Sequence, residues 1–164
     1  MVFIASGTHR QSFNRAIHWI QIAEQEHLVC GPIVVQTARV GSEGGVVWKD
    51  ILPELEFIHL IRKADVLITH GGPATIVTAL SEGRVPIIIP RERQYREHVD
   101  DHQVQFAKVL ASIGLPVART LPALRALLND DRNNNLNADA ILRKVSTGFE
   151  NLSLLFTDLR HQIR

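Results

Sequence analysis

Residues 66–90 read VLITHGGPATIVTALSEGRVPIIIP, and this stretch carries the clearest structural signal in the chain. An apolar run over 66–69 ends at His70, and two glycines and Pro73 follow it. Residues 74–82 are amphipathic and lead through Gly83 into a second apolar run over 85–89. Continuous apolar runs are typical of strands buried on both faces, Pro73 suits the first turn of a helix, and Gly83 suits its end. The stretch therefore predicts a strand, a glycine turn, a helix and a second strand.

The same alternation extends along most of the chain. Hydrophobic patterning predicts further strands at 2–5, 33–37, 46–48 and 116–118, and helices at 13–26, 53–62, 98–112 and 121–128. Ser12 is the expected cap of the helix over 13–26. Strands that alternate with helices are typical of an α/β fold, here a Rossmann-like, doubly wound parallel sheet with helices on both faces. In such sheets ligands bind beyond the carboxyl ends of the strands.

Length and composition restrict the class of protein. The 164 residues fit one domain, with a core over about 1–128, a polar break at 130–137 and C-terminal helices over about 138–162. A net charge of +1, with no basic stripe that alternates with aromatic residues, disfavours a nucleic-acid partner. One cysteine, Cys30, rules out a disulfide within the chain and favours a reducing compartment. The N-terminus does not resemble a signal peptide, and no apolar run approaches the ~20 residues that span a bilayer.

Two turns in the sequence place glycine between a strand and a helix. His70, Gly71 and Gly72 follow one predicted strand, and Gly7 and Thr8 follow the first. Free backbone N–H groups and the dipole at a helix start favour anionic oxygens, and glycine allows a close approach or a positive φ. Two such turns on adjacent strands can hold a diphosphate, with the Thr75 hydroxyl as a further donor. The alternative is a tight connection without a ligand. Neither turn has the spacing of a dinucleotide fingerprint or a P-loop.

Four stretches of the sequence carry a resemblance to a known family. ITHGGPATIVTALSEGRVPIIIPR followed by EHVDDHQVQFA resembles the C-terminal domain of family 28 glycosyltransferases, the MurG-like group. The stretches VFIASGTHRQSFNRAI and VVQTA resemble its short, stand-alone members, which include the catalytic subunit of the eukaryotic dolichol-linked N-acetylglucosamine transferase and related bacterial exopolysaccharide subunits. The resemblance covers about residues 1–120.

The resemblance implies one half of a GT-B enzyme, the half that binds a UDP-sugar. The acceptor half would then be a separate, membrane-anchored subunit that binds a lipid-linked or polysaccharide acceptor. We therefore expect a cytoplasmic chain, peripheral to the cytoplasmic face of a membrane, that contacts the membrane only through its partner. No cofactor is implied. The alternatives are a non-catalytic module that regulates or scaffolds a partner and, ranked last because the chain is short, another sugar-nucleotide enzyme such as a 2-epimerase.

The family pattern implies donor-binding roles for particular residues. The diphosphate loop corresponds to His70, Gly71, Gly72, Ala74 and Thr75, the first glycine turn to Gly7 and Thr8, and the element that contacts sugar hydroxyls to Asp101, His102 and Gln103. Many relatives place a ribose-binding glutamate where this chain has Thr78, and Glu82, one helical turn further on, is a weak substitute.

Sugar transfer leaves negative charge on the departing diphosphate, which helix starts can stabilise without a metal. We assign His70 as the catalytic contact to that diphosphate, with a strand-end residue hydrogen-bonded to backbone as the alternative. Arg91 or Arg93 is a candidate cation, or else a solvated surface residue, and the general base is expected from the missing half. His98 and His102, four residues apart, would share one helix face that suits a metal, but further ligands are not evident, so no metal is predicted.

Overall fold

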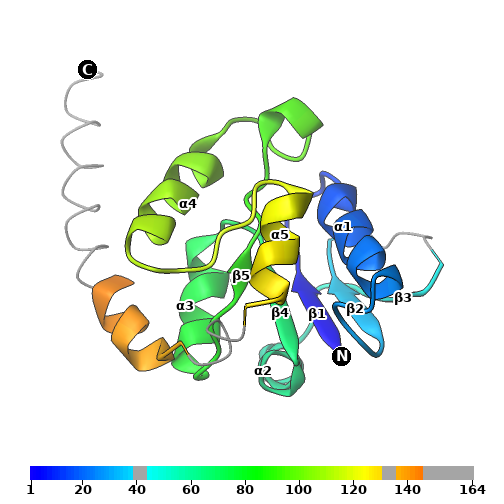
Figure 1. Cartoon of the computed structure of the whole chain (residues 1–164), viewed down its shortest axis with the longest axis horizontal. Helices are drawn as coiled ribbons and strands as arrows, with labels where there is room; N and C mark the ends of the chain where they lie inside the picture. Colours follow the sequence, from blue (N-terminus) through cyan, green and yellow to red (C-terminus); the bar gives the residue numbers. More distant parts are fainter. Residues whose placement is uncertain (39–43, 131–135, 146–164) are drawn as a thin grey trace.

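The computed structural model describes residues 1–38, 44–130 and 136–145 (Figure 1). Its five-stranded sheet is made of β1 (Val2–Ala5), β2 (Ile33–Gln36), β3 (Val46–Lys49), β4 (Val66–Thr69) and β5 (Ile87–Ile88). The strands lie in the order β3-β2-β1-β4-β5, and every pair is parallel. The predicted α/β class and parallel sheet are confirmed. The order reverses between β1 and β4, which are neighbours in space although more than sixty residues separate them.

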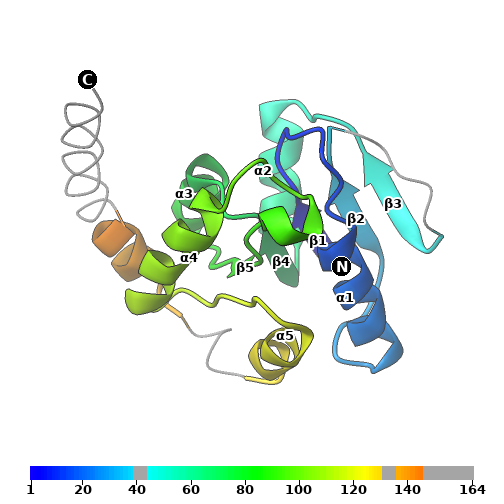
Figure 2. The ribbon, with the colours of Figure 1, turned by 90° about the horizontal axis from the view of Figure 1, so that it is seen from above.

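Helices cover both faces of the sheet, as Figure 2 shows. On one face lie α1 (Asn14–Gln25) and α5 (Leu121–Leu128), and on the other α2 (Glu54–Lys63) and α3 (Pro73–Ser81). Successive strand residues alternate between the layers: Ile4 packs with α1 and α5, whereas Phe3 packs with α2 and α3. A third apolar cluster joins α3 to α4 (His102–Ser112) and to helical residues 138–145.

Several predicted boundaries are wrong, each for a local reason. The N-cap of α1 is Phe13, without a side-chain cap, so Ser12 does not cap it. The helix expected from residue 98 begins at His102, because the chain turns through Arg96 at φ 57° and Asp100 accepts a hydrogen bond from His102 N–H. The run over 85–89 forms only the short β5, and the strand expected over 116–118 is an isolated bridge between Ile88 and Val117. The helix predicted beyond 145 lies outside the described residues.

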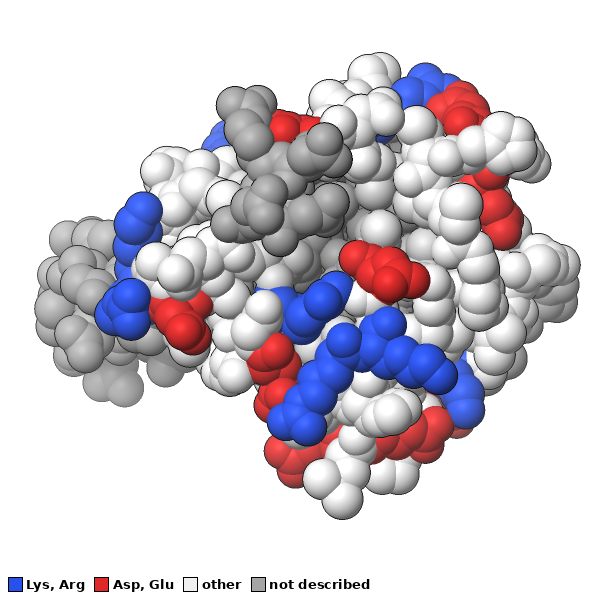
Figure 3. Space-filling view, turned by 60° about the horizontal axis from the view of Figure 1, so that its bottom comes forward, with Lys and Arg blue, Asp and Glu red and all other residues white. Residues whose placement is uncertain are grey.

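Charged side chains mix on the molecular surface. Figure 3 shows one face on which a group of Lys and Arg side chains is bordered by Asp and Glu side chains. Pairs such as Arg62–Glu82 and the N-terminal amine with Asp65 exemplify this mixing. Among the described residues, no helix has both the length and the apolar character needed to cross a membrane.

Candidate functional site

The two glycine turns lie side by side at the point where strand order reverses. Ala5, the last residue of β1, pairs with Thr69, the last residue of β4. The turn that starts at Gly7 and the turn at His70–Gly72 therefore leave the same edge of the sheet from neighbouring strands. This is the position at which ligands bind in doubly wound sheets.

One imidazole ring fills the space between the turns. A Cβ atom built on Gly7 would lie 2.6 Å from ring atoms of His70, and one built on Gly72 would lie 2.2 Å from His70 Nε2. No side chain fits at either position unless the ring moves. Gly7 also has φ +80°, whereas Gly72 has an ordinary φ of −80° and Gly71 is not left-handed. At Gly71 and Gly72 the reason for glycine is therefore the close approach of neighbouring atoms, and not the positive φ that we had also considered.

The backbone determines the hydrogen bonding of His70. Its Nδ1 lies 3.2 Å from the carbonyl oxygen of Ala5, which can only accept, so we assign the proton to Nδ1 and the lone pair to Nε2. Burial lowers the pKa of His70 to about 4, and the nearby positive charge of Arg91 adds to that effect, although the bond to Ala5 opposes it. The ring is thus neutral at pH 7, and the backbone-bonded strand-end role that we had kept as an alternative is present in the structure.

The start of α3 offers unused backbone donors. Its N-cap is Gly72, which has no side chain to satisfy the first amides, and Pro73 occupies the first helical position. Ala74 is exposed and Thr75 partly exposed, so an oxygen ligand can reach the amides of these residues. Thr78 lies one turn further along and donates its hydroxyl to Ala74 O at 3.0 Å. Glu82 lies beyond the opposite end of α3, paired with Arg62, so it does not replace the family's ribose-binding glutamate.

Gln103 connects the second glycine turn to the segment after β5. Its buried Oε1 accepts from Gly71 N–H at 3.2 Å and from Arg91 N–H at 3.1 Å. A Cβ on Gly71 would lie 2.9 Å from Gln103 Cβ, which explains that glycine. Gln103 was predicted to contact sugar, but its side-chain oxygen is already bonded to the protein backbone. Asp101 and His102, the other predicted sugar contacts, are exposed, and Asp101 accepts from Arg93 N–H at 2.9 Å.

Arg91 is not a solvated surface residue, and its guanidinium does not face the position expected for the UDP-sugar. It is fully buried, and its guanidinium donates to the carbonyl oxygens of Ser6 at 2.8 Å, Gln11 at 2.8 Å and Glu97 at 3.1 Å. The guanidinium also lies over the Phe13 ring, 4.7 Å from its centroid. Burial lowers the pKa of Arg91 to about 10, which leaves it charged at pH 7. The structure thus corrects our prediction: Arg91 positions the first glycine turn instead of facing a ligand.

An ion-pair network that the sequence analysis missed holds the loop around the 3-10 helix η1 (Arg93–Tyr95). Arg15 of α1 makes a bidentate pair with the buried Glu97, at 2.7 and 3.1 Å, and donates to Pro90 O at 2.8 Å. Arg119 pairs with the buried Glu92 at 3.0 Å through two nitrogens. These partners are 82 and 27 positions apart in the sequence. No local pattern could have indicated them.

An open hollow of about 750 Å³ adjoins the first glycine turn. It is lined by Thr8, His9, Arg10, Gln11, Ser12 and Arg96. Arg10 and Arg96 are exposed there and supply the cationic side chains that the buried Arg91 cannot. A second hollow of about 510 Å³ lies at the amino ends of the strands, lined among others by Asp65 and Arg84, and is remote from the glycine turns.

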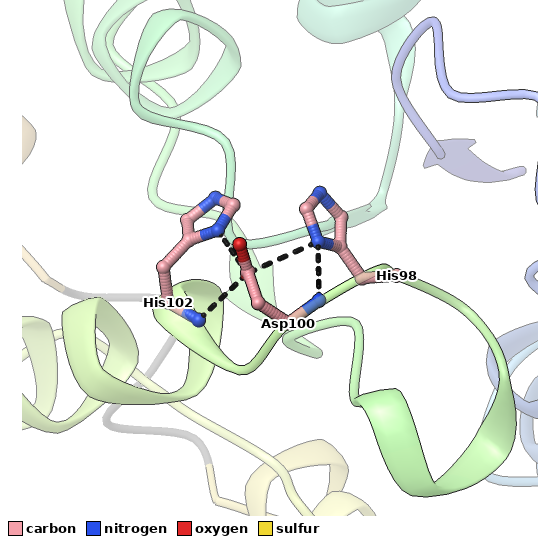
Figure 4. A group of neighbouring side chains, drawn as sticks. All are labelled: His98, Asp100 and His102. Carbon is pink, nitrogen blue, oxygen red and sulfur yellow. Dashed lines mark hydrogen bonds and ion pairs between the residues drawn. The ribbon is translucent and has the colours of Figure 1, made fainter.

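His9, which lines the hollow beside the first glycine turn, lies close to two further histidines. The ring centroids of His9 and His98 lie 4.3 Å apart, and those of His98 and His102 lie 4.5 Å apart. His98 precedes α4 and is not on the helix, so our expectation of a shared helix face is wrong. The turn through Asp100 nevertheless brings His98 and His102 together around that carboxylate (Figure 4).

This fold, a doubly wound parallel sheet with two glycine turns at its switch point, defines the class: a Rossmann-like domain of the kind found in GT-B glycosyltransferases. The chain belongs to a family within that class, since the model of the glycosyltransferase family 28 C-terminal domain matches residues 1–153.

Curated relatives of the chain are bacterial enzymes of one name. It is 29% identical over 96 residues to the UDP-N-acetylglucosamine--N-acetylmuramyl-(pentapeptide) pyrophosphoryl-undecaprenol N-acetylglucosamine transferase of Shewanella pealeana. It is 31% identical over 99 residues to the enzyme of that name from Shewanella sp. strain ANA-3. The matches cover 58% and 55% of this chain but only 24% and 26% of those enzymes. The chain thus corresponds to about a quarter of the relatives' length.

Solved glycosyltransferases share the fold at low sequence identity. The spinosyn forosaminyltransferase SpnP superposes with a TM-score of 0.57 at 21% identity, over 88% of this chain and 39% of that protein. SnogD from Streptomyces nogalater gives a TM-score of 0.54 at 20% identity, over 87% and 37%. MurG of Acinetobacter baumannii gives 0.53 at 17% identity, over 85% and 43%. These likenesses support the fold.

Proposed function

We propose that this chain is the donor-binding, catalytic half of a split glycosyltransferase that transfers a sugar from a UDP-sugar to a lipid-linked or polysaccharide acceptor. The acceptor half is a separate, membrane-anchored polypeptide, and this chain is peripheral to the cytoplasmic face of that membrane. The observation that carries the proposal is the convergence of two glycine turns on His70 at the switch point of the sheet.

In this proposal the donor diphosphate lies against the His70 ring, beyond the carboxyl ends of β1 and β4. The amides of Ala74 and Thr75 and the Thr8 hydroxyl donate to its oxygens, and Arg10 and Arg96 compensate its charge. His70 meets the diphosphate with Nε2. Because that nitrogen carries a lone pair at neutral pH, the phosphate oxygens favour its protonation, and donor binding takes up a proton. Asp101 and His102, both exposed, are the groups left to contact sugar hydroxyls.

The proposal assigns the general base to the acceptor half, and the low basicity of His70 is consistent with that assignment. His70 is a weak base at pH 7 because its pKa is about 4. In this proposal the general base for the acceptor hydroxyl comes from the partner, and His70 is not that base. The chain alone should bind UDP weakly and turn over negligibly.

One observation favours a second candidate, a non-catalytic module. The Thr78 hydroxyl is bonded to Ala74 O, so the position of the family's ribose contact makes only a local bond. A degenerate module of this kind would not bind UDP at all.

Calorimetric titration with UDP, in the presence of the partner chain, tests the proposal. Gly72→Ala should weaken UDP binding at least tenfold, because the added Cβ would displace His70 into the diphosphate position. Gly44→Ala is the matched control, since a Cβ at Gly44 meets no atom within 4 Å. Absence of heat with wild-type protein and partner would leave only the non-catalytic module. Substantial sugar transfer by the purified single chain would refute the split-enzyme claim while retaining donor binding.

A further inference from the structure

Three side chains of metal-ligand type converge on one point between residues 98 and 102. The Nδ1 atom of His98 lies 3.2 Å from Asp100 Oδ1, and the same oxygen is in short contact with His102 Nδ1. All three ligand atoms lie within 4.8 Å of one another. Figure 4 shows the two imidazoles turned toward the carboxylate from opposite sides.

The spacing suits a tetrahedral ion. Zinc–nitrogen and zinc–oxygen bonds are about 2.0–2.1 Å, so neighbouring ligand atoms of a tetrahedral site lie about 3.3 Å apart. The distance between His98 Nδ1 and Asp100 Oδ1 already has this value. The His102 ring has to shift relative to the carboxylate and to His98, since the three ligand atoms lie within 4.8 Å of one another, and its side chain, 60% exposed, is free to do so.

His98 Nδ1 faces both the amide and the carboxylate of Asp100. Asp100 N–H points at Nδ1 at a long 3.4 Å, and Asp100 Oδ1 lies 3.2 Å from the same nitrogen. In the tautomer that carries its proton on Nε2, Nδ1 has the lone pair that a metal ligand needs. The His98 side chain is 5% exposed, so packing holds this nitrogen close to the carboxylate. A cation between Nδ1 and Oδ1 is bound by both atoms.

The carboxylate is also held in place. Asp100 Oδ1 accepts from His102 N–H at 3.1 Å, which fixes the turn at the start of α4. The His9 ring packs against the His98 ring, with centroids 4.3 Å apart. The ligand set is therefore preorganised by the backbone and by packing, as a metal site requires.

We propose that His98, Asp100 and His102 bind one divalent transition-metal ion of the zinc class, and that water completes the fourth position. Imidazole with one carboxylate suits zinc, cobalt or nickel, whereas magnesium and calcium require oxygen ligands. Asp100 and His102 are each more than half exposed, so the ion and its water are reached from solvent. The ion fixes the turn that leads into Gln103, the residue that holds Gly71 and Arg91.

Cobalt titration of the untagged, chelator-treated full chain at pH 7 tests this inference without any donor or partner. One Co²⁺ per chain should bind and give the visible absorption of a four-coordinate site, and Zn²⁺ should displace it and raise the melting temperature. His102→Ala and Asp100→Asn should each weaken binding by at least about tenfold, because even the loss of outer-shell partners has effects of that size. Both positions are exposed, so these variants should fold.

His18→Ala and His59→Ala are the matched controls, since both histidines are exposed and lie on α1 and α2. They should bind Co²⁺ as the wild type does. The inference is overturned if the wild type shows no stoichiometric binding, or if His102→Ala and Asp100→Asn keep the wild-type affinity. Either result leaves the proposed diphosphate binding unaffected, because its contacts come from other residues, and only His102 is shared with the proposed sugar contacts.

Discussion

The neutral, buried His70 makes the stability of this protein depend on pH in a way that one substitution can isolate. Burial holds its folded-state pKa near 4, against an ordinary value of 6.5. As pH falls below 6.5 the unfolded chain takes up a proton that the folded chain does not. Folding stability therefore decreases as pH falls, and this loss is complete once the folded state is protonated as well, below about pH 4.

The size of the effect follows from the shift. One pKa unit corresponds to about 1.4 kcal/mol, so the full loss is about 3.4 kcal/mol. At pH 5, where most unfolded chains are protonated and most folded chains are not, the loss is about 2 kcal/mol. Other titrating groups add their own pH dependence, so the comparison has to be between two proteins that differ only at residue 70.

His70→Asn is the suitable variant. Its amide can donate to Ala5 O as Nδ1 does, and it does not titrate. Urea denaturation at pH 7, 6 and 5 gives the unfolding free energy of each protein. The stability advantage of wild type over variant should shrink by about 2 kcal/mol between pH 7 and pH 5. His59→Asn, at an exposed histidine, should show no such change. A wild-type advantage that stays constant over this range would show that His70 is not desolvated, and its description as a neutral imidazole at pH 7 would lose its basis.

Three further substitutions test the contacts that position the site. Gly72→Ala should destabilise the fold by about 1–3 kcal/mol through overpacking against His70, whereas Gly44→Ala should be neutral, as thermal denaturation can measure. Arg91→Lys should cost about 3 kcal/mol in urea denaturation, because a single ammonium group cannot reach the carbonyls of Ser6, Gln11 and Glu97 together. Arg93→Lys, at an exposed arginine, should have little effect, and equal losses for both would contradict the positioning role. Gln103→Leu leaves the amides of Gly71 and Arg91 without their acceptor, so it should cost about 2 kcal/mol and speed hydrogen exchange at both amides, and unchanged exchange would argue against that link.

Local patterns in the sequence predicted the layers of this protein well. The apolar runs, Pro73 at the first position of α3 and Gly83 after its end are each properties of neighbouring residues, and the structure has them as expected. The edge on which Gly7 and His70 meet also followed from the alternation, because parallel strands place their carboxyl ends together. Boundaries were less accurate where a side chain outside the pattern intervened, as Asp100 does at the start of α4.

The sequence by itself determined a parallel α/β sheet and the two glycine turns that mark its ligand position, because hydrophobic period and turn chemistry are local. Only the tertiary structure decided what each polar side chain does there. Arg91 is buried because the carbonyls of the distant Ser6 and Gln11 and of the nearby Glu97 converge on it. Gly7 and Gly72 have no room for a side chain because the His70 ring lies against both. His98 and His102 meet through a turn rather than a helix face. Such contacts depend on chain topology, which brings together groups as many as 85 positions apart, and no local pattern records them.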